Sequence, residues 1–426
     1  MDRNSPTYRT YCNILKEELI PAMGCTEPIS IAYAASYVRD LLGGEPDRME
    51  IEASGNLIKN VKSVVVPNTG GLRGIPAAAA AGIVAGQTQK VLEVISQVSP
   101  EQKEKIRTYL KKQEITVSLK ETDLTLDFLM TAYRGTQWAQ VRIANYHTNL
   151  IFVRRNDEIL LDCPVSCSQN ATQMEYGTLN LTDILDFAET AQLEDLSECI
   201  DQQISCNLAI AWEGLQGEYG TATGKTLLER FGDSNVEIRM RAFASAASEA
   251  RMNGCEMPVV IVSGSGNQGI TASVPVAVYA QVNGMSREQL IRATTVSDLL
   301  TIYQKSFIGR LSAFCGAVSA GAAAAAGVCF LNGGRKKEIA DTLTNALATD
   351  AGIVCDGAKS SCAAKISAIL EASLQGWHMA KAGRVFSGGD GLVGENAAVT
   401  IANMGELARK GMQETDHKIL EIMTKE

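Results

Sequence analysis

The alternation of apolar and polar residues over 114–162, and its end near Cys163, constrain the fold more than any other feature of this sequence. The segments EITVSLK, DLTLDFLMTAYRG, WAQVRIANYHTNLIFVRR and EILLDCP are rich in β-branched and aromatic residues, with turns between them, which is typical of antiparallel hairpins. From residue 181 onward nearly every segment shows the spacing of a helix with one apolar face. The sequence therefore predicts an α+β fold in two domains: residues 1–175, a mixed α+β domain with an antiparallel sheet, and residues 176–426, an all-helical domain.

The first domain also contains helical patterns. Residues 6–20 and 27–42 predict helices, RMEIEASG predicts a strand, and GIPAAAAAGIVAG predicts a helix of small residues that starts near Pro76. The polar, turn-rich segment 164–180 marks the expected boundary between the two domains.

One uncharged stretch, AFCGAVSAGAAAAAGVCFLN at 313–332, has the length of a membrane span. Leucine, isoleucine and phenylalanine are scarce in it, while alanine and glycine dominate. This composition favours a tightly packed buried helix over a membrane span.

Composition and charge narrow the classes of ligand. The chain has 426 residues, is 46% hydrophobic and carries a net charge of −9, without a block of lysine or arginine. We therefore expect no nucleic-acid partner, no membrane association and a small-molecule ligand. Eleven cysteines, an odd number, and an N-terminus with scattered charges predict reduced thiols in a cytoplasmic protein. We also expect a homo-oligomer, taken as a dimer.

Cys25 lies between a glycine and a Thr-Glu-Pro turn, immediately before an apolar helical run, in GCTEPISIAYA. A helix N-terminus favours the thiolate over the thiol, which makes Cys25 a candidate for chemistry. The alternative is packing, because free cysteine behaves as a small hydrophobe. Glu27 is either an acid or base beside Cys25 or a residue that complements the helix N-terminus, and the second interpretation is favoured.

Three further cysteines occupy turns and helix starts: Cys315, Cys355 and Cys362. No C-x-x-C motif is present, which argues against zinc ribbons and fingers. Three thiolates of this kind can bind three irons of a cubane cluster and leave the fourth iron open, as a Lewis-acid cluster requires. Three buried apolar cysteines are the alternative interpretation.

Glycine-rich turns are further candidates for binding. SGSGNQG, CDGAKSSC and SGGDGLVGEN contain glycines that let successive backbone N–H groups converge on an anion. SGSGNQG lacks the lysine of a P-loop and the glycine spacing of a dinucleotide site. Lys59 and Asn60 of SGNLIKN, expected at the end of a strand, are either contacts for a substrate carboxylate or part of a solvated face.

Several motifs, in this order, resemble the L-cysteine desulfidase family, relatives of the iron-sulfur L-serine dehydratase α chain. They are PAMGCTEP, SGNLIKN, HTNL, SGSGNQGITASVPV, CGAVSAGAAAAAG, CDGAKSSCAAKI, SGGDGLVGEN and GMQETDHKIL, and the resemblance extends from about residue 15 to the C-terminus. It implies that Cys315, Cys355 and Cys362 bind a 4Fe-4S cluster. It also implies that Cys25 acts at the active site as a base or a displaceable fourth ligand.

The implied reaction converts L-cysteine and water to pyruvate, ammonia and hydrogen sulfide. An open iron would bind the leaving sulfur as a Lewis acid. Cys25, with a pKa lowered by the helix start and the cluster, would take the Cα proton of this small amino-acid substrate. The SGSGNQG turn, with Ser265, Asn267 and Gln268, would hold the α-carboxylate.

Three alternatives remain open. The closest is an iron-sulfur L-serine dehydratase, although the C-terminal KILEIMTKE has no cysteine and SGSGNQG replaces the threonine-proline-rich loop of that group. A non-catalytic iron-sulfur sensor or amino-acid-binding protein would show a basic or aromatic interaction surface, which the sequence does not suggest. A pyridoxal-phosphate lyase is the third.

The other cysteines are expected to pack in the interior: Cys12, Cys163, Cys167, Cys199, Cys206, Cys255 and Cys329. His147 falls where the resemblance implies a histidine after a strand, but a lone histidine is more often structural. His378 and His417 are expected to face solvent.

Overall fold

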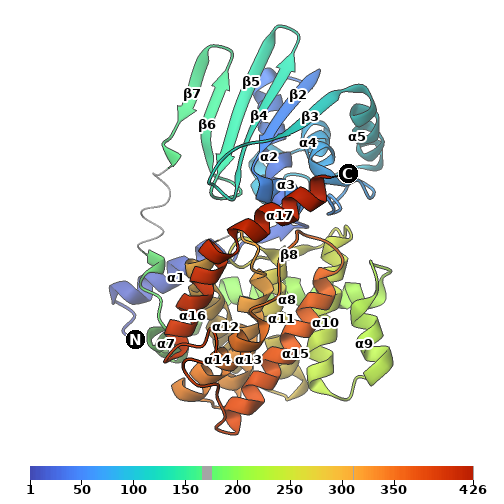
Figure 1. The fold of residues 1–426 in the computed structure, drawn as a ribbon. Helices are drawn as coiled ribbons and strands as arrows, with labels where there is room; N and C mark the ends of the chain where they lie inside the picture. The colour runs from blue at the N-terminus through green and yellow to red at the C-terminus, as the bar shows by residue number, and fades with distance from the viewer. Residues whose placement is uncertain (166–174, 310, 426) are drawn as a thin grey trace.

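The computed structural model describes residues 1–165, 175–309 and 311–425. It confirms the α+β fold class, with a sheet in the N-terminal half and a mostly helical C-terminal half. Figure 1 shows the sheet and its helices at the top of the molecule, above the helical body.

The N-terminal half alternates helices with short strands. Its helices are α1 (Pro6–Glu18), α2 (Thr26–Leu42), α3 (Gly55–Val61), α4 (Gly74–Ala85), η1 (Thr88–Glu93) and α5 (Pro100–Lys112). Its strands are β1 (Pro21–Met23), β2 (Arg48–Ala53), β3 (Glu114–Leu119), β4 (Asp127–Arg134), β5 (Gln137–Ala144), β6 (Leu150–Arg155) and β7 (Glu158–Asp162).

The six-stranded sheet has the order β3-β2-β4-β5-β6-β7. The expected antiparallel hairpins are confirmed for β4 to β7, and β2 also pairs antiparallel with β4. The expectation is wrong for β3, which pairs parallel with β2. A parallel neighbour needs a long crossover connection, and here α3, α4, η1 and α5 supply it. Met49, Ile51 and Ala53 of β2 are buried, and α2 packs against β4 and β5.

The C-terminal half consists of helices around one central helix. They are α7 (Leu181–Thr190), α8 (Leu193–Gln216), α9 (Thr223–Phe231), α10 (Val236–Met252), α11 (Gly266–Val282), α12 (Arg287–Ile308), α13 (Gly316–Leu331), α14 (Lys336–Asp350), α15 (Cys362–Lys381), α16 (Ala397–Glu406), η3 (Leu407–Gly411) and α17 (Gln413–Thr424).

This half is not purely helical, because it also contains β8 (Pro258–Val260). The strand pairs antiparallel with β1 of the other half, with Pro21 opposite Val260 and Met23 opposite Pro258. The expectation of an all-helical domain is therefore wrong at β8. A three-residue strand whose partner lies in the other half leaves no alternation for sequence reasoning to detect.

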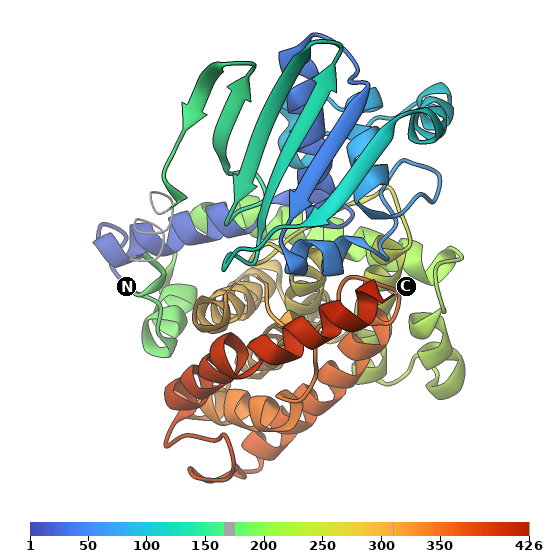
Figure 2. The same ribbon diagram turned by 45° about the horizontal axis from the view of Figure 1, so that its top comes forward.

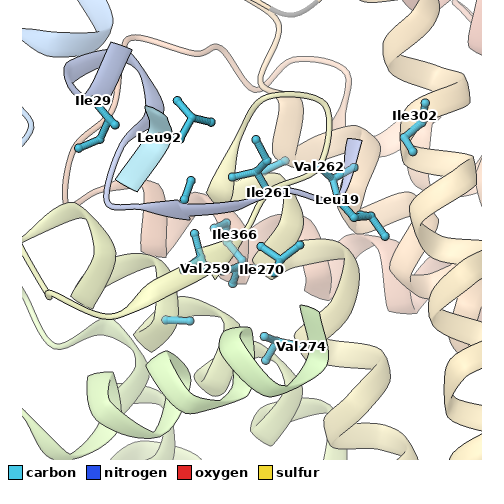
Figure 3. Packing of buried hydrophobic residues seen from close by; sticks show 14 of the residues in the cluster. Leu19, Ile29, Leu92, Val259, Ile261, Val262, Ile270, Val274, Ile302 and Ile366 are labelled. Atoms are coloured by element: carbon cyan, nitrogen blue, oxygen red, sulfur yellow. The ribbon is translucent and has the colours of Figure 1, made fainter. Parts of the chain in front are cut away.

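Apolar side chains from both halves pack around the β1–β8 pair (Figure 3). Leu19 precedes β1, Val259 and Ile261 belong to or follow β8, and Ile270 lies on α11. The hydroxyl of Thr26, the first residue of α2, donates to the backbone oxygen of Gly264 at 2.9 Å. The start of α2 is thus fixed against the turn that precedes α11.

The helices near the two ends of the chain each pack against the opposite half of the molecule. Helix α1 packs against α8 and α12, and α17 packs against α3. Figure 2 shows the C-terminal helix in red between the sheet half and the helical body. The expected boundary near residue 175 adjoins 166–174, which lie outside the described residues.

The alanine-glycine stretch forms α13, which is almost entirely buried and is surrounded by α11, α12, α14 and α15. A Cβ on Gly321 would lie 2.4 Å from Cγ2 of Ile369, so small residues let these helices approach closely. The expectation of a buried helix is confirmed. Within the described ranges no helix is both long and apolar enough to cross a membrane.

A buried acid and amide join α8 to α12. Gln203 donates from Nε2 to Oδ1 of Asp298 at 2.9 Å, and both residues are fully buried. Oε1 of Gln203 and Oδ2 of Asp298 have no hydrogen-bond partner among the described residues. Burial raises the pKa of Asp298 to about 8, although the Gln203 hydrogen bond opposes the shift. A protonated Asp298 can donate to Gln203, which would satisfy both oxygens.

Asp298→Asn should therefore change how stability depends on pH. Between pH about 4 and about 8 the unfolded chain releases the Asp298 proton and the native state keeps it, so the native unfolding free energy falls as pH rises, by up to about 1.4 kcal/mol per pH unit. The uncharged asparagine removes this decline, so the variant gains stability relative to the native chain as pH rises. Urea denaturation at pH 5 and pH 8 measures the difference, and parallel stability curves would contradict the assignment. Asp298→Leu should cost about 1–3 kcal/mol at pH 5, because it leaves Gln203 without a partner, and this cost should shrink toward pH 8 because leucine also removes the decline.

Candidate active site

A cavity of about 100 Å³ lies between the two halves. Eight of the nine site residues expected from the sequence line it: Cys25, Asn60, Ser265, Asn267, Gln268, Cys315, Cys355 and Cys362. They come from segments far apart in the chain, and only the fold brings them together.

Four helices begin at this cavity. Cys25, Ser265 and Cys315 are the N-cap residues of α2, α11 and α13, and Cys362 is the first residue of α15. The first N–H groups of a helix lack partners within the helix and carry partial positive charge. The cavity wall therefore favours thiolates and carboxylates.

The Cys25 thiol donates to Oε2 of Glu27 at 2.9 Å, and the amide of Asn60 donates to Oε1 of the same carboxylate at 3.1 Å. Gly24, the residue before Cys25, packs closely against Pro67, because its φ is +59° and a Cβ there would lie 2.1 Å from Cγ of Pro67. Glu27 was expected to complement the helix N-terminus. It lies in the first turn of α2, as this interpretation requires, and its carboxylate also lines the cavity and accepts hydrogen bonds from Cys25 and Asn60.

The protonation of this group differs from the sequence-based expectation. Burial raises the pKa of the Cys25 thiol well above its usual value, and the charge of Glu27 adds to the effect. The expected lowering by the helix start is thus wrong for the chain alone, because desolvation outweighs the helix dipole. Burial also acts to raise the pKa of Glu27, but nearby His147 and the bond from Cys25 outweigh it, so the pKa is lowered. Glu27 is placed to accept the Cys25 proton.

Cys315 and Cys355 lie on adjacent extended segments. Phe314 forms an isolated antiparallel bridge with Val354, and the amide of Cys355 donates to the backbone oxygen of Ala313 at 2.6 Å. Cys362 follows one turn later and contacts the small apolar cluster of Cys25, Val64 and Met252. Cys25 and the three expected cluster thiols therefore surround one space.

Gly357 lets the loop between Cys355 and Cys362 pack against α3. Its φ is +94°, and a Cβ there would lie 2.4 Å from the backbone oxygen of Lys59. Any other residue would push the loop away from the cavity.

The donor set fits an iron-sulfur cluster. Thiolates are its usual ligands, and the ten described cysteines are all free. No group of three or more histidine, cysteine or carboxylate side chains in the described ranges is arranged to hold a single metal ion. A cluster differs from a single ion because each thiol binds a different iron, so its ligands are spread more widely.

The Cys315 and Cys362 thiols are neutral in the chain alone. Burial raises the pKa of Cys315 to about 12, and the neighbouring Cys355 adds to the shift. Burial also raises the pKa of Cys362. The ammonium of Lys365 opposes both shifts, and it is fixed by the backbone oxygen of Val354 at 2.8 Å.

Lys59 is the one expected residue that does not line the cavity. It lies on helix α3 and not at the end of a strand, and it is buried. Its ammonium forms an ion pair with Asp416 of α17 and donates to the backbone oxygen of Cys355 at 3.4 Å. Asp416 could not be predicted as its partner, because the two residues are 357 positions apart in the chain.

Sequence reasoning missed the cations of the site. Arg251, Lys305 and Lys365 line the cavity, and Glu27 is its only carboxylate within the described part of the chain. Arg251 ends an alanine-rich helical segment, where an arginine normally faces solvent, yet it is only 2% exposed. The burial of Arg251 becomes evident only from the packing of α10 against α11 in the structure.

The remaining candidates lie elsewhere. Cys255 and Cys329 are buried, Cys12, Cys163, Cys199 and Cys206 are half-buried, and Cys167 is outside the described residues. His378 and His417 are not buried, whereas His147 is buried near Glu27. SGGDGLVGEN forms a largely exposed loop whose residues do not line the cavity.

Comparison with known proteins identifies the family of this chain. Residues 89–421 match the sequence profile of the serine dehydratase alpha chain. A UPF0597 protein of Desulfitobacterium hafniense is 48% identical over 99% of this chain and 98% of its own length. Similar proteins of Treponema denticola and Bacteroides fragilis are 43% and 37% identical, over 100% and 96% of this chain and the same shares of their own lengths. The chain therefore belongs to the serine dehydratase alpha chain family, whose members are lyase-type enzymes.

Proposed function

We propose that this chain is an L-cysteine desulfidase that converts L-cysteine and water to pyruvate, ammonia and hydrogen sulfide. The observation that carries the proposal is the single cavity lined by Cys25 and by Cys315, Cys355 and Cys362. Membership of a lyase family supports the reaction type.

Cys315, Cys355 and Cys362 would hold a 4Fe-4S cluster as thiolates. Such a cluster, when bound, supplies a Lewis acid for the leaving group of the substrate. Lys365 and the N-termini of α13 and α15 stabilise the negative charge of these thiolates.

Cys25 and Glu27 would move the proton. Glu27 would accept the thiol proton along the existing 2.9 Å hydrogen bond, and Arg251 and the N-terminus of α2 would stabilise the Cys25 thiolate that this transfer forms. The thiolate takes the Cα proton of the substrate, the C–H electron pair forms the Cα–Cβ double bond, and the Cβ–S bond breaks to release HS⁻. The product, 2-aminoacrylate, tautomerises to an imine, and water hydrolyses the imine to pyruvate and ammonia.

An L-serine dehydratase is the second candidate, favoured by the description of the matching family. The same groups would remove the Cα proton, and hydroxide would leave instead of HS⁻. The two candidates therefore differ in the leaving group and not in the base.

A direct assay separates them. The protein is reconstituted with iron and sulfide without oxygen, freed of excess sulfide, and given L-cysteine or L-serine at several concentrations. We expect kcat/KM to favour L-cysteine, with equal amounts of pyruvate and sulfide formed. A preference for L-serine would establish the dehydratase, and no pyruvate from either amino acid would refute both candidates.

Cys25→Ala should separate catalysis from cluster binding. Three ligands remain, so the reconstituted variant keeps its iron and acid-labile sulfide, while pyruvate release falls roughly a hundredfold through loss of the base. Cys355→Ala should instead lose the cluster. Cys206→Ala, which removes a half-buried thiol outside the cavity, serves as the control for both measurements. Near-normal turnover by Cys25→Ala would show that Cys25 packs in the interior and is not the base.

Glu27→Gln should test the proton acceptor. The amide has nearly the same shape but cannot take the Cys25 proton, so we expect kcat to fall roughly a hundredfold while iron content stays unchanged. Glu27→Asp should recover part of the rate, because it keeps the carboxylate. Equal activity of the glutamine and native enzymes would exclude proton transfer through Glu27.

A further inference from the structure

Three buried polar atoms at the cavity have no hydrogen-bond partner among the residues that the structure describes. They are Oδ1 of Asn60, Oε1 of Gln268 and Nε of Arg251. The side chains are 6%, 5% and 2% exposed, respectively. Buried polar groups are nearly always paired in native proteins, so three unpaired groups around one cavity indicate a ligand that pairs with them.

The three atoms differ in kind. Two are neutral oxygens that can only accept hydrogen bonds, and the third is an N–H of a permanent cation. An α-amino acid carries an ammonium group with three donors next to a carboxylate that accepts. The oxygens of Asn60 and Gln268 suit the ammonium group, and Arg251 suits the carboxylate.

The orientation of Arg251 is fixed. Its Nη1 donates to Oδ1 of Asn267 at 3.1 Å, and that oxygen also accepts from Ser248 at 3.1 Å. The guanidinium lies against Gly266, where a Cβ would come within 2.3 Å of Nε. Because position 266 has no side chain, the Nε–H can share one ligand with the N-terminus of α11.

A hydrogen bond orients Asn60, and packing holds the side chain of Gln268. Asn60 gives its amide hydrogen to Glu27, which identifies the other atom of the amide as the unpaired oxygen. The Gln268 carboxamide packs against Gly316, where a Cβ would lie 2.7 Å from its Cδ. The negative charge of Glu27 beside Asn60 adds to the attraction for an ammonium group.

We propose that Arg251 binds the α-carboxylate of the substrate and that Asn60 and Gln268 bind its α-ammonium group. This assigns Gln268 to the opposite end of the substrate from the expectation drawn from the sequence, because its unpaired atom is an acceptor. The inference rests on the proposed function only in that the ligand is an α-amino acid, and it holds equally for cysteine and serine.

Unreactive analogues test each end of the ligand separately. L-Alanine has both charged groups, propionate lacks the ammonium group and L-alaninol lacks the carboxylate. Isothermal titration calorimetry on the oxygen-free reconstituted protein should show the tightest binding for L-alanine. Equal binding of all three compounds to the native protein would overturn the proposal.

Variants then assign the residues. Arg251→Met should weaken L-alanine binding roughly ten- to a hundredfold and leave L-alaninol binding unchanged, as expected for loss of a charged hydrogen bond. Arg251→Lys should recover part of the affinity for L-alanine. This recovery would show that the loss in Arg251→Met does not come from a folding defect. Arg241→Met, on the same helix but outside the cavity, is the matched control. Equal losses for L-alanine and L-alaninol with Arg251→Met would overturn the carboxylate assignment.

Gln268→Glu gives the sharpest result for the ammonium end. A carboxylate there should preserve or strengthen L-alanine binding if Gln268 faces the ammonium group, and should abolish it if Gln268 faces the carboxylate. Gln268→Met should weaken L-alanine roughly fivefold or more without affecting propionate, and Asn60→Ser should behave in the same way. Gln281→Met, exposed on the same helix, is the control.

Turnover assays distinguish a failure of this ligand assignment from a failure of the proposed reaction. If neither cysteine nor serine is converted, the proposed reaction fails, but the analogue titrations still decide the ligand assignment. If turnover occurs, Gln268→Met should raise KM more than it lowers kcat, since the contact exists before and during the reaction.

Discussion

The pairing of β1 with β8 is the contact on which the candidate active site depends. It joins two segments whose neighbours, Thr26 and Gly264, are 238 residues apart, and it fixes the start of α2 beside the start of α11. With α13 and α15 beginning at the same cavity, four helix N-termini converge. Each brings partial positive charge into a buried space, so the protein is electrostatically prepared for anions.

The glycines around the cavity are needed for close packing as much as for their backbone conformations. A side chain at Gly24 would collide with Pro67, and one at Gly357 would collide with the backbone of Lys59. Gly266 and Gly316 leave room for Arg251 and Gln268. The motifs that carry the thiols are glycine-rich because four elements must approach within van der Waals distance while their functional groups face the same space.

The sequence is informative where the physical cause is local. Alternation identifies β4 to β7, and helical spacing together with small residues identifies α13, because neither signal depends on a distant partner. A cysteine before an apolar helical run similarly locates Cys25 and Cys315 at helix starts. The partners of β3 and β8, the Lys59–Asp416 ion pair and the burial of Arg251 depend on contacts between distant segments, which a single sequence does not contain.

Burial and charge act in opposite directions on the thiols, and their balance explains the composition of the site. Desolvation keeps Cys25, Cys315 and Cys362 protonated in the chain alone, so three buried thiols do not repel one another during folding. In the proposed function, binding of iron would require the protons of Cys315 and Cys362 to leave, because the thiolate is the ligand. Lys365 and the helix N-termini then stabilise the charge that appears. Glu27 has the opposite role, because it stays ionised beside the neutral Cys25 thiol and accepts its hydrogen bond. In the proposed function, one desolvated cavity thus holds three thiols for metal binding and a fourth for proton transfer, and the carboxylate two residues after Cys25 distinguishes the fourth from the others.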